Sequence, residues 1–196
     1  KRVVNRGESE KADQIYQDLI EQTTNESEKE PIYHELGCDK QNQGEDEEAI
    51  NLFEKAFASR QQSLPPNHPE LASFYNNIGA VYGSMGEYSK ALSSYERALA
   101  IRQESLPSNH SYLAFSYNNI GSLYGRMGEH AKSLPYLEKA LAIQQQSLPS
   151  NHPYLATFYC NIGLSYENMG DYSKARSFYE LAVDSGQQSL PSNHPH

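Results

Sequence analysis

Apolar residues recur with a helical period in two successive stretches of the chain, clearest between residues 69 and 106. From Leu71 the apolar side chains return every three or four residues as far as Met85, which predicts an amphipathic helix of about four turns. Gly86 interrupts the pattern, as a glycine at a helix C-terminus does, and a second helical pattern then runs from Tyr88 to Leu99. Because the connection is so short, the two stretches predict an antiparallel helix pair.

The same pattern returns at a fixed interval along the chain. A linker of the form Ser-Leu-Pro-x-Asn-His-Pro starts at residues 63, 105, 147 and 189, with Ser111 once in place of the last proline, so the period is 42 residues. A chain that repeats one helix pair stacks its copies instead of wrapping them round a single core. We therefore expect an all-α solenoid of antiparallel helix pairs that forms one continuous array. Its expected segments are the second helix of a preceding partial repeat (1–24), a degenerate repeat (25–66), and three further repeats (67–108, 109–150 and 151–196).

Individual residues of the repeat carry local structural signals. Asn67 or His68 is expected to cap the first helix of its repeat. Gly79 and Ala91 remove side-chain bulk, so the two helices of the pair should approach each other closely there. Pro135 falls about one turn into the second helix of its repeat, and we interpret it as a tolerated near-terminal proline rather than a kink.

Charge and composition narrow the classes of function. The net charge is −9, and residues 1–62 account for −7 of it, with 8 basic against 15 acidic residues. An acidic surface without basic clusters argues against binding to nucleic acid or to anionic membranes. No apolar run approaches the roughly 20 residues that span a bilayer, so we expect no membrane segment. The chain begins at Lys1 with nothing that resembles a signal peptide, and we expect it to be part of a longer protein.

The chain holds two cysteines, Cys38 and Cys160, about three repeats apart. Because neighbouring helices pack roughly 8–10 Å apart, three helix pairs should place the two thiols too far from each other for an intrachain disulfide. Two free thiols favour a reducing compartment, most simply the cytoplasm.

Catalytic and metal sites are not expected. His68, His110, His152 and His194 are four histidines in identical contexts, but successive copies should lie roughly 15–20 Å apart, whereas zinc ligands converge to about 2 Å from one ion. Helix capping therefore explains these histidines better. Cys160 has no paired base at a recognisable spacing, and the sequence contains no phosphate-binding loop. We predict no enzyme activity, no metal and no cofactor.

The repeat resembles the tetratricopeptide repeat (TPR) in a set of residues that includes Tyr75, Ile78-Gly79, Tyr82, Gly86, Tyr88, Ala91, Tyr95 and Ala98. The 42-residue period and the run Asn67-His68-Pro69-Glu70-Leu71-Ala72 are similar to the kinesin-light-chain type of this repeat. The resemblance implies a right-handed superhelix in which the first helices of the repeats line a concave groove. It also implies a scaffold or adaptor that binds an extended peptide segment of a protein partner in that groove, as kinesin light chain cargo-binding repeats do. The alternative is a structural spacer, or a segment that associates with itself end to end, within a larger multidomain protein.

The residues that the resemblance places on the groove lie on the first helices of the last three repeats. Asn77, Asn119 and Asn161 each precede an Ile-Gly pair, and an amide side chain offers both a donor and an acceptor to a peptide backbone. Two roles stay open for these asparagines, because they can contact a bound peptide or bond within the protein and position the next repeat. The complete set of expected groove residues is Asn76, Asn77, Asn118, Asn119, Arg126, Cys160, Asn161 and Asn168.

Overall fold

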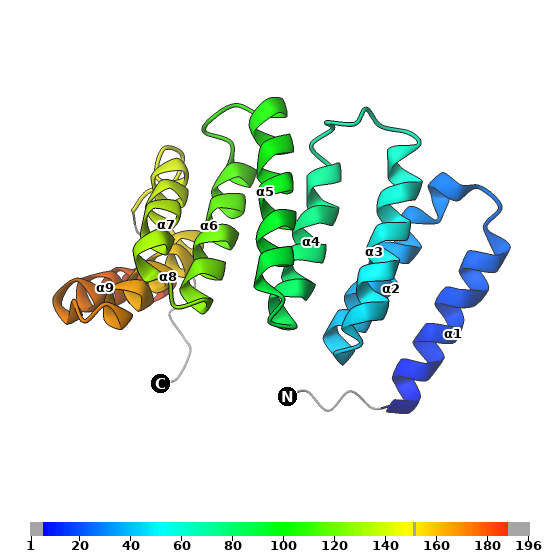
Figure 1. Ribbon diagram of the computed structural model, residues 1–196, viewed down its shortest axis with the longest axis horizontal. Coiled ribbons are helices and arrows are strands. Elements are labelled where there is room, and N and C mark those ends of the chain that lie inside the picture. Colours follow the sequence, from blue (N-terminus) through cyan, green and yellow to red (C-terminus); the bar gives the residue numbers. More distant parts are fainter. Residues whose placement is uncertain (1–5, 151, 188–196) are drawn as a thin grey trace. The chain divides into compact units, whose positions relative to one another are not determined.

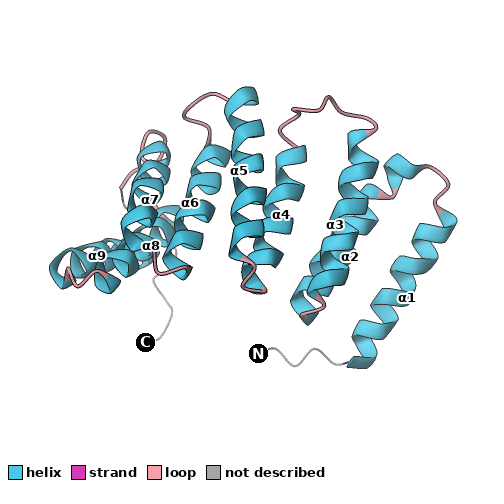
Figure 2. Cartoon of the chain, viewed as in Figure 1, coloured by secondary structure: helices cyan, strands magenta, loops and turns pink. Residues whose placement is uncertain are grey.

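The computed structural model describes residues 6–150 and 152–187, which contain α-helices and two short 3₁₀ helices but no strand (Figure 1; Figure 2). The α-helices are α1 (Arg6–Gln22), α2 (Glu30–Gln43), α3 (Asp46–Gln61), α4 (Leu71–Ser84), α5 (Tyr88–Ser105), α6 (Ser111–Arg126), α7 (His130–Gln144), α8 (Ala156–Asn168) and α9 (Tyr172–Gln187), and the 3₁₀ helices are η1 (Glu26–Glu28) and η2 (Pro153–Leu155). Helices that follow each other in the chain pack as pairs, such as α2 with α3, α6 with α7 and α8 with α9. The predicted all-α fold of helix pairs is confirmed. In this described part of the chain, no helix is both long and apolar enough to cross a membrane.

Two compact units divide the chain, Lys1–Ile101 and Arg102–His196. In the N-terminal unit, α3 and α4 bury one apolar cluster that includes Phe53, Ile78 and Val81. In the C-terminal unit, Leu137 of α7 and Ile162 of α8 are almost fully buried. Each unit therefore has its own apolar core between successive helix pairs. The boundary falls within α5, the second helix of the repeat predicted at 67–108.

A glycine in the left-handed conformation follows the first helix of each repeat. At Gly86, φ is 79°, and the N–H of Glu87 donates to the carbonyl of Tyr82 at 2.9 Å, which closes the last turn of α4. A residue with a Cβ atom is strained at this φ, so the position selects glycine. The four equivalent residues are Gly44, Gly86, Gly128 and Gly170, and all have φ between 76° and 82°. The predicted helix end at Gly86 is confirmed.

A second set of glycines lies where the two helices of a pair meet. A Cβ atom built on Gly79 of α4 would lie 2.8 Å from the ring of Tyr95 and 3.3 Å from the carbonyl oxygen of Ala91, both on α5. Real Cβ atoms do not approach ring carbons this closely, so only glycine fits. The predicted close approach of the two helices is confirmed, and equivalent contacts occur at Gly37, Gly121 and Gly163.

Histidine side chains cap two of the described helix starts after the linkers. His110 Nδ1 accepts the N–H of Tyr112 at 3.2 Å at the start of α6, and His152 Nδ1 accepts the N–H of Tyr154 at 3.3 Å at the start of η2. His68 Nδ1 accepts the N–H of Glu70 at 3.4 Å, but Glu70 is the N-cap residue of α4, and that helix has no side-chain cap. The capping role is confirmed for His110 and His152 and is wrong for His68, whereas His194 lies outside the described residues. Within the described ranges, no group of His, Cys, Asp and Glu side chains is arranged to hold a metal ion.

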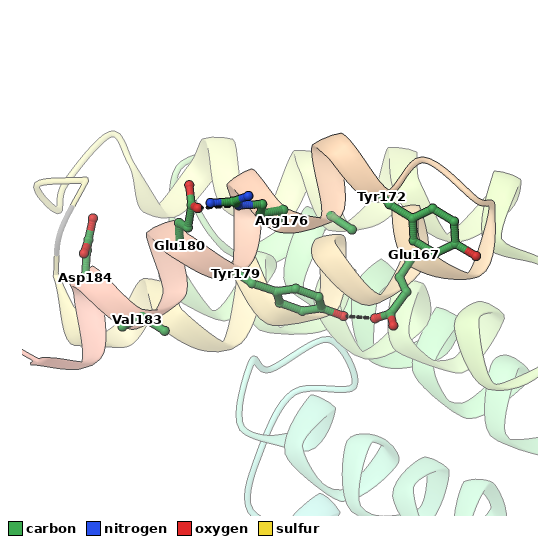
Figure 3. A pocket seen from close by; sticks show the side chains of 8 residues that line it. Glu167, Tyr172, Arg176, Tyr179, Glu180, Val183 and Asp184 are labelled. Carbon is green, nitrogen blue, oxygen red and sulfur yellow. Dashed lines mark hydrogen bonds and ion pairs between the residues drawn. The ribbon is translucent and has the colours of Figure 1, made fainter. Parts of the chain in front are cut away.

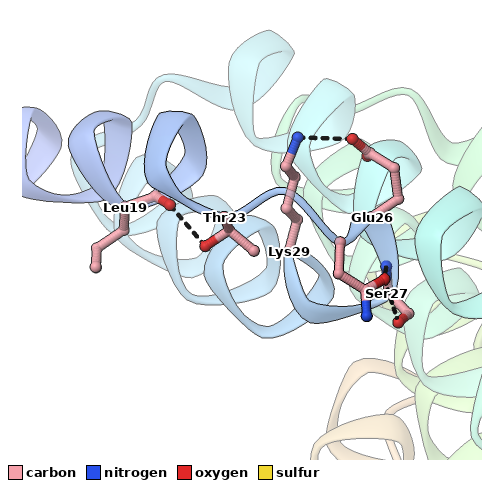
Figure 4. A network of polar contacts seen from close by, with 6 residues as sticks. Leu19, Thr23, Glu26, Ser27 and Lys29 are labelled. Atoms are coloured by element: carbon pink, nitrogen blue, oxygen red, sulfur yellow. Dashed lines mark hydrogen bonds and ion pairs between the residues drawn. The ribbon is translucent and has the colours of Figure 1, made fainter.

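The connection from α1 to α2 is stabilised by local polar contacts (Figure 4). At the end of α1, the hydroxyl of Thr23 donates to the carbonyl of Leu19 at 2.7 Å. Around η1, the ammonium group of Lys29 pairs with the carboxylate of Glu26 at 2.6 Å. These contacts are exposed, so each contributes little to stability and mainly fixes the path of the chain.

A buried lysine fastens α1 to the following helix pair. The Lys40 side chain on α2 lies 2.7 Å from Asp13 of α1, 2.8 Å from Glu45 and 3.6 Å from Glu48. Burial alone would lower the pKa of Lys40, but the hydrogen bonds to Asp13 and Glu45 outweigh it and raise that pKa above its ordinary value. The later repeats have a tyrosine at this position, the first of them Tyr82. The degenerate repeat thus departs from the others at a position where it contacts α1.

Helix α7 runs without a break through Pro135, which lies exposed in its second turn. This agrees with a tolerated proline near the start of the helix, where few backbone hydrogen bonds are lost.

Candidate protein-interaction surface

In the N-terminal unit, the expected groove residue Asn77 joins α4 to α2. Its side-chain nitrogen lies 2.9 Å from Nε2 of His34, and both side chains are half-buried. Because the amide nitrogen donates, Nε2 of His34 is the acceptor in this bond. The His34 ring in turn packs against Phe53 and Phe74, with centroid distances of 5.7 and 6.1 Å. Asn77 is therefore bonded to the first helix of the preceding repeat.

In the C-terminal unit, Asn161 joins α8 to α6 in the same way. Its side-chain nitrogen donates to Oδ1 of Asn118 at 3.0 Å and to the hydroxyl of Ser122 at 3.1 Å. The structure thus brings together Asn118 and Asn161, both expected on the groove. Both N–H groups of the Asn161 amide are used inside the protein, so only its carbonyl oxygen is left to accept a bond from a ligand.

The other expected groove residues lie on the same helices with different exposure. Asn76 on α4 and Asn119 on α6 are half-buried, whereas Arg126, Cys160 and Asn168 are exposed. The Asn168 amide donates to the carbonyl of its own helix at Leu164, at 2.8 Å. The structure therefore does not gather all of the expected residues into one cluster, and a peptide contact remains a proposal for each of them.

Exposed aromatic side chains divide two neighbouring hollows on the C-terminal unit. One hollow has a volume of about 590 Å³ and is lined by Phe115, Asn118, Tyr154 and Phe158, among others. The second has a volume of about 320 Å³ and shares Phe115 and Tyr154 with the first, with Gln144 at its edge. Phe115 is 40 % exposed and Tyr154 is 68 % exposed. The residues that line these two hollows include no Asp, Glu, Lys or Arg in the described part of the chain, so the surface is apolar with polar side chains such as Asn118, His152 and Gln144 at its rim.

This aromatic surface is specific to the later repeats. One period before Phe115 the chain has Ser73, and two periods before Tyr154 it has Glu70. Phe115 and Tyr154 were not predicted as groove residues; the nearest predicted asparagines, Asn118 and Asn161, follow them by about one and two helical turns. The sequence does contain a signal for these residues. At each of the two positions an aromatic residue replaces the polar residue of an earlier repeat, at a place that the repeat leaves exposed.

A third hollow, of about 280 Å³, lies between α6, α7 and α8 beside Asn161. Its floor contains two buried serine hydroxyls, of Ser133 and Ser165, whose oxygens are 3.2 Å apart. Arg126 and His130 also line it, and the buried Nδ1 of His130 has no hydrogen-bond partner. The hollow therefore combines apolar walls with several polar atoms.

We call the place where the second helix of one repeat packs against the first helix of the next a joint between repeats. The third hollow exists because the joint of α7 with α8 has, overall, smaller side chains than its counterpart in the N-terminal unit, the joint of α3 with α4. The two joints are related by two periods of 42 residues, and the counterpart is filled by a buried apolar cluster. Phe53 to Leu137 and Val81 to Ser165 reduce side-chain volume from the N-terminal to the C-terminal joint, and Ala49 to Ser133 adds a polar hydroxyl. Volume and apolar surface are both lost at this joint, so the space stays open.

The two cysteines lie in different settings. Burial raises the pKa of the Cys38 thiol, and the nearby carboxylates of Glu35 and Asp39 raise it further, which disfavours the reactive thiolate. Cys160 is a free thiol on the exposed face of α8. What the surface offers is apolar contact and hydrogen bonding.

Comparison with known proteins agrees with this architecture. A family model described as tetratricopeptide repeat matches residues 28–104 and, a second time, residues 112–188. No sequence among curated proteins matches the chain.

Solved structures with similar folds include three repeat proteins. BtubC (BKLC) from P. vanneervenii has a TM-score of 0.79 and 21 % identity over 98 % of this chain and 79 % of its own. A protein from Podosopora anserina, described as a kinesin light chain with nearly identical TPR-like repeats, has a TM-score of 0.72 and 22 % identity over 95 % of this chain and 89 % of its own. MamA has a TM-score of 0.64 and 22 % identity over 93 % of this chain and 91 % of its own. At these identities the likeness concerns the fold.

Two matches of the family model cover most of the chain, and the helix pairs, the glycine contacts and the glycine helix ends recur within them. The chain therefore belongs to the tetratricopeptide repeat family.

Proposed function

We propose that this chain is a protein-interaction module, a scaffold or adaptor that binds an extended peptide segment of a partner protein along the exposed face of α6 and α8. The observation that carries the proposal is the pair of neighbouring hollows divided by Phe115 and Tyr154. Their volumes fall in the range of about 300–1,000 Å³ that is typical of ligand pockets in proteins. Large exposed aromatic side chains beside such hollows are typical of surfaces that bind other proteins.

The hollows offer anchoring positions for apolar side chains of the peptide. Burying one Leu, Ile or Phe side chain contributes roughly 1.5–3 kcal/mol, so two anchors would contribute roughly 3–6 kcal/mol of the about 8 kcal/mol that a micromolar affinity requires, before the entropic costs of binding. The amides of Asn118 and Gln144 and the hydroxyl of Thr157 lie at the edges, where they can bond the peptide backbone. Because the lining carries no Asp, Glu, Lys or Arg, we expect the anchoring side chains to be uncharged.

The hydrogen bonds of Asn161 connect the two helices that carry this surface. They hold α8 against α6, and they therefore fix the spacing of the residues that line the hollows on these two helices. A surface held in place before binding loses less conformational entropy when the ligand arrives, which favours affinity. Asn161 thus has a positioning role in the proposal.

A selection experiment tests the proposed function. A random peptide library is panned on the immobilised protein, and the affinities of the selected peptides are measured by fluorescence anisotropy. Phe115→Ser and Tyr154→Glu place in the hollows the residues that the chain itself has at Ser73 and Glu70, so both changes should be tolerated by the fold. Each variant is expected to weaken binding by about tenfold or more, which corresponds to about 1.4 kcal/mol.

The control is Tyr112→Glu, which makes the same change one period before Tyr154, at a tyrosine that is 51 % exposed and lies outside both hollows. It should leave the affinities unchanged. Selected peptides that bind Phe115→Ser and Tyr154→Glu as well as they bind the unaltered protein would refute the proposed surface. If no peptide is selected, a structural spacer or self-associating segment becomes the better explanation, and sedimentation velocity over a concentration series distinguishes those two.

Two free cysteines agree with the expected location of such a module in a reducing compartment such as the cytoplasm. The proposed role is binding and requires no metal or cofactor. No nucleic-acid or membrane partner is proposed, because the expected partner is a protein or peptide.

A further inference from the structure

The third hollow continues the proposed peptide surface along α6 and α8. Asn118 lines the first hollow, of about 590 Å³, and Asn161, to which it is bonded at 3.0 Å, lines the third. On α6, Phe115 lies at the first hollow and Ser122 lies at the third, seven positions further along the helix. Seven positions of an α-helix correspond to about 10 Å, which an extended peptide covers in about three residues. One bound segment can therefore reach both hollows.

An unmatched acceptor and an unmatched donor lie next to each other in the third hollow. The Asn161 amide uses both of its N–H groups inside the protein, and its carbonyl oxygen accepts no hydrogen bond from the described part of the chain. The Ser122 hydroxyl accepts one of those N–H groups at 3.1 Å, but within the described ranges it donates its own proton to no acceptor. A ligand group that offers one donor and one acceptor would complete both side chains.

The walls and the floor of the third hollow favour an uncharged side chain. Leu137 is buried and Leu164 is 52 % exposed, so both can pack against methylene groups of a ligand. At the floor, the hydroxyls of Ser133 and Ser165 donate to helix carbonyls at 2.7 and 3.0 Å. No Asp or Glu lines the hollow in the part of the chain that the structure describes, so a lysine of the ligand would lose water without gaining a counter-ion. Arg126 lies exposed to solvent, where an ion pair with a ligand carboxylate contributes little.

The hollow of about 420 Å³ on α9 shows the opposite arrangement (Figure 3). There the hydroxyl of Tyr179 donates to Glu167 at 2.6 Å, and the guanidinium of Arg176 donates to Glu180 at 2.8 Å. These donors already have partners, and both partners are carboxylates. The third hollow differs in having no carboxylate among its described lining residues and in presenting a donor and an acceptor that are still to be matched.

We propose that the third hollow binds the side-chain amide of a Gln or Asn residue of the peptide, about three residues from the apolar side chain that occupies the first hollow. This inference rests on the proposed function and adds a second specificity element to it. The ligand amide would donate to the carbonyl oxygen of Asn161 and accept the proton of Ser122. A carboxylate has only acceptors and an ammonium group only donors, so neither matches both side chains. A ligand without the amide leaves the two side chains unpaired, which costs affinity.

Peptide selection and one matched pair of variants test the proposal. Peptides selected from the random library on the unaltered protein are expected to contain an apolar residue and, about three positions away, Gln or Asn. Versions of these peptides with Leu or Glu in place of the amide residue should bind about tenfold more weakly in fluorescence anisotropy. Ser122→Ala gives the hollow the residue that the chain has one period earlier, at Ala80, so the fold should tolerate it.

Ser122→Ala is expected to weaken binding of the amide peptide about fivefold and to change binding of its Leu version less than about twofold. A purely structural effect of the substitution would weaken both peptides equally, so the comparison separates ligand contact from positioning. Ser73→Ala, at an exposed serine of α4, is the matched control and should change neither affinity.

Selected peptides with apolar residues but without an amide preference would overturn this inference and leave the proposed function standing. Amide peptides that bind no tighter than their Leu versions would also overturn it and would point to contact with the peptide backbone. Tighter binding of the Glu versions would identify an ion pair with Arg126 instead. Equal losses of the amide and Leu peptides in Ser122→Ala would make the role of Ser122 structural and would overturn it as well. If the library yields no peptide at all, the proposed function fails and this inference fails with it.

Discussion

Replacement of Asn161 by alanine separates the two roles that the sequence leaves open for the asparagines. The change removes two partly buried hydrogen bonds, of 3.0 Å to Asn118 and 3.1 Å to Ser122. Each such bond contributes a net of about 0.5–1.5 kcal/mol, so the free energy of unfolding should fall by about 2 kcal/mol. In a chain of this size, that loss should lower the melting temperature by roughly 4–8 °C.

The assay is thermal and urea unfolding of both proteins, followed by circular dichroism. Asn168→Ala is the matched control, because it changes the same residue type on the same helix at an exposed position, where the amide bonds only a carbonyl of α8. It should cost less than about 0.5 kcal/mol. A double-mutant cycle with Asn118→Ala should give a coupling energy of about 0.5–1 kcal/mol if the bond between the two amides contributes as described.

A melting temperature of Asn161→Ala equal to that of Asn168→Ala would refute this reasoning. The two bonds would then contribute nothing to stability, and a role in contacting the ligand would become the better explanation of the asparagines. The affinity of Asn161→Ala for the peptides selected from the library completes the test. A variant that keeps its stability but loses peptide affinity would assign Asn161 to direct contact.

Three further predictions concern the joints between repeats and the last described helix. Ser165→Val restores the side-chain type of the N-terminal joint and should stabilise the protein by less than about 1 kcal/mol in urea unfolding. Two buried methyl groups replace one hydroxyl, and the bond to the carbonyl of Asn161 and the 3.2 Å contact with Ser133 are lost, while Ser133 keeps its bond to the carbonyl of Gly121. Destabilisation would mean that the third hollow needs its hydroxyl. Gly121→Ala places a Cβ atom 2.7 Å from a neighbouring side chain and should destabilise by about 1–3 kcal/mol, whereas Gly128→Ala, which meets no atom but has a φ of 76°, should cost about 1 kcal/mol. Burial and the bond to Glu167 raise the pKa of Tyr179 to about 12 from an ordinary value of 10.0, so the folded state keeps this proton longer than the unfolded state. Stability should therefore fall as pH rises from 10.0 to about 12, and Tyr179→Phe should reduce that fall in unfolding measured across this range; an identical fall in the variant would contradict the assignment.

The repeat and its helix ends could be predicted because they depend on local chemistry. A left-handed residue after each first helix selects glycine whatever surrounds it, so Gly86 marks the same turn in the sequence and in the structure. Likewise, the close approach of two helices at Gly79 could be predicted from the glycine itself. The structure gives the reason, because no residue with a Cβ atom fits against Tyr95 there. The capping histidines, of which His110 is an example, belong to the same class of local signal.

The candidate site could be predicted only in part. The family resemblance selected the helices on which Asn118 and Asn161 lie, but not that these two amides bond to each other across 43 positions of sequence. Phe115 and Tyr154 were not predicted, because the hollows beside them form only where α6, the end of α7, η2 and the start of α8 meet. Whether a side chain lines a hollow depends on residues that are distant in the sequence.

By itself, the sequence determined an α-helical repeat with a 42-residue period, its turns and its helix caps, because each of these follows from backbone conformation and from contacts within one helix pair. Tertiary structure decided which joint between repeats is filled and which is open. Ile162 is buried in the C-terminal joint as Ile78 is in the N-terminal one, yet the smaller side chains around it leave a hollow there. Packing is a property of several side chains from different helices at once, so the open spaces, and with them the surfaces proposed for partners, appear only when the helices are placed together.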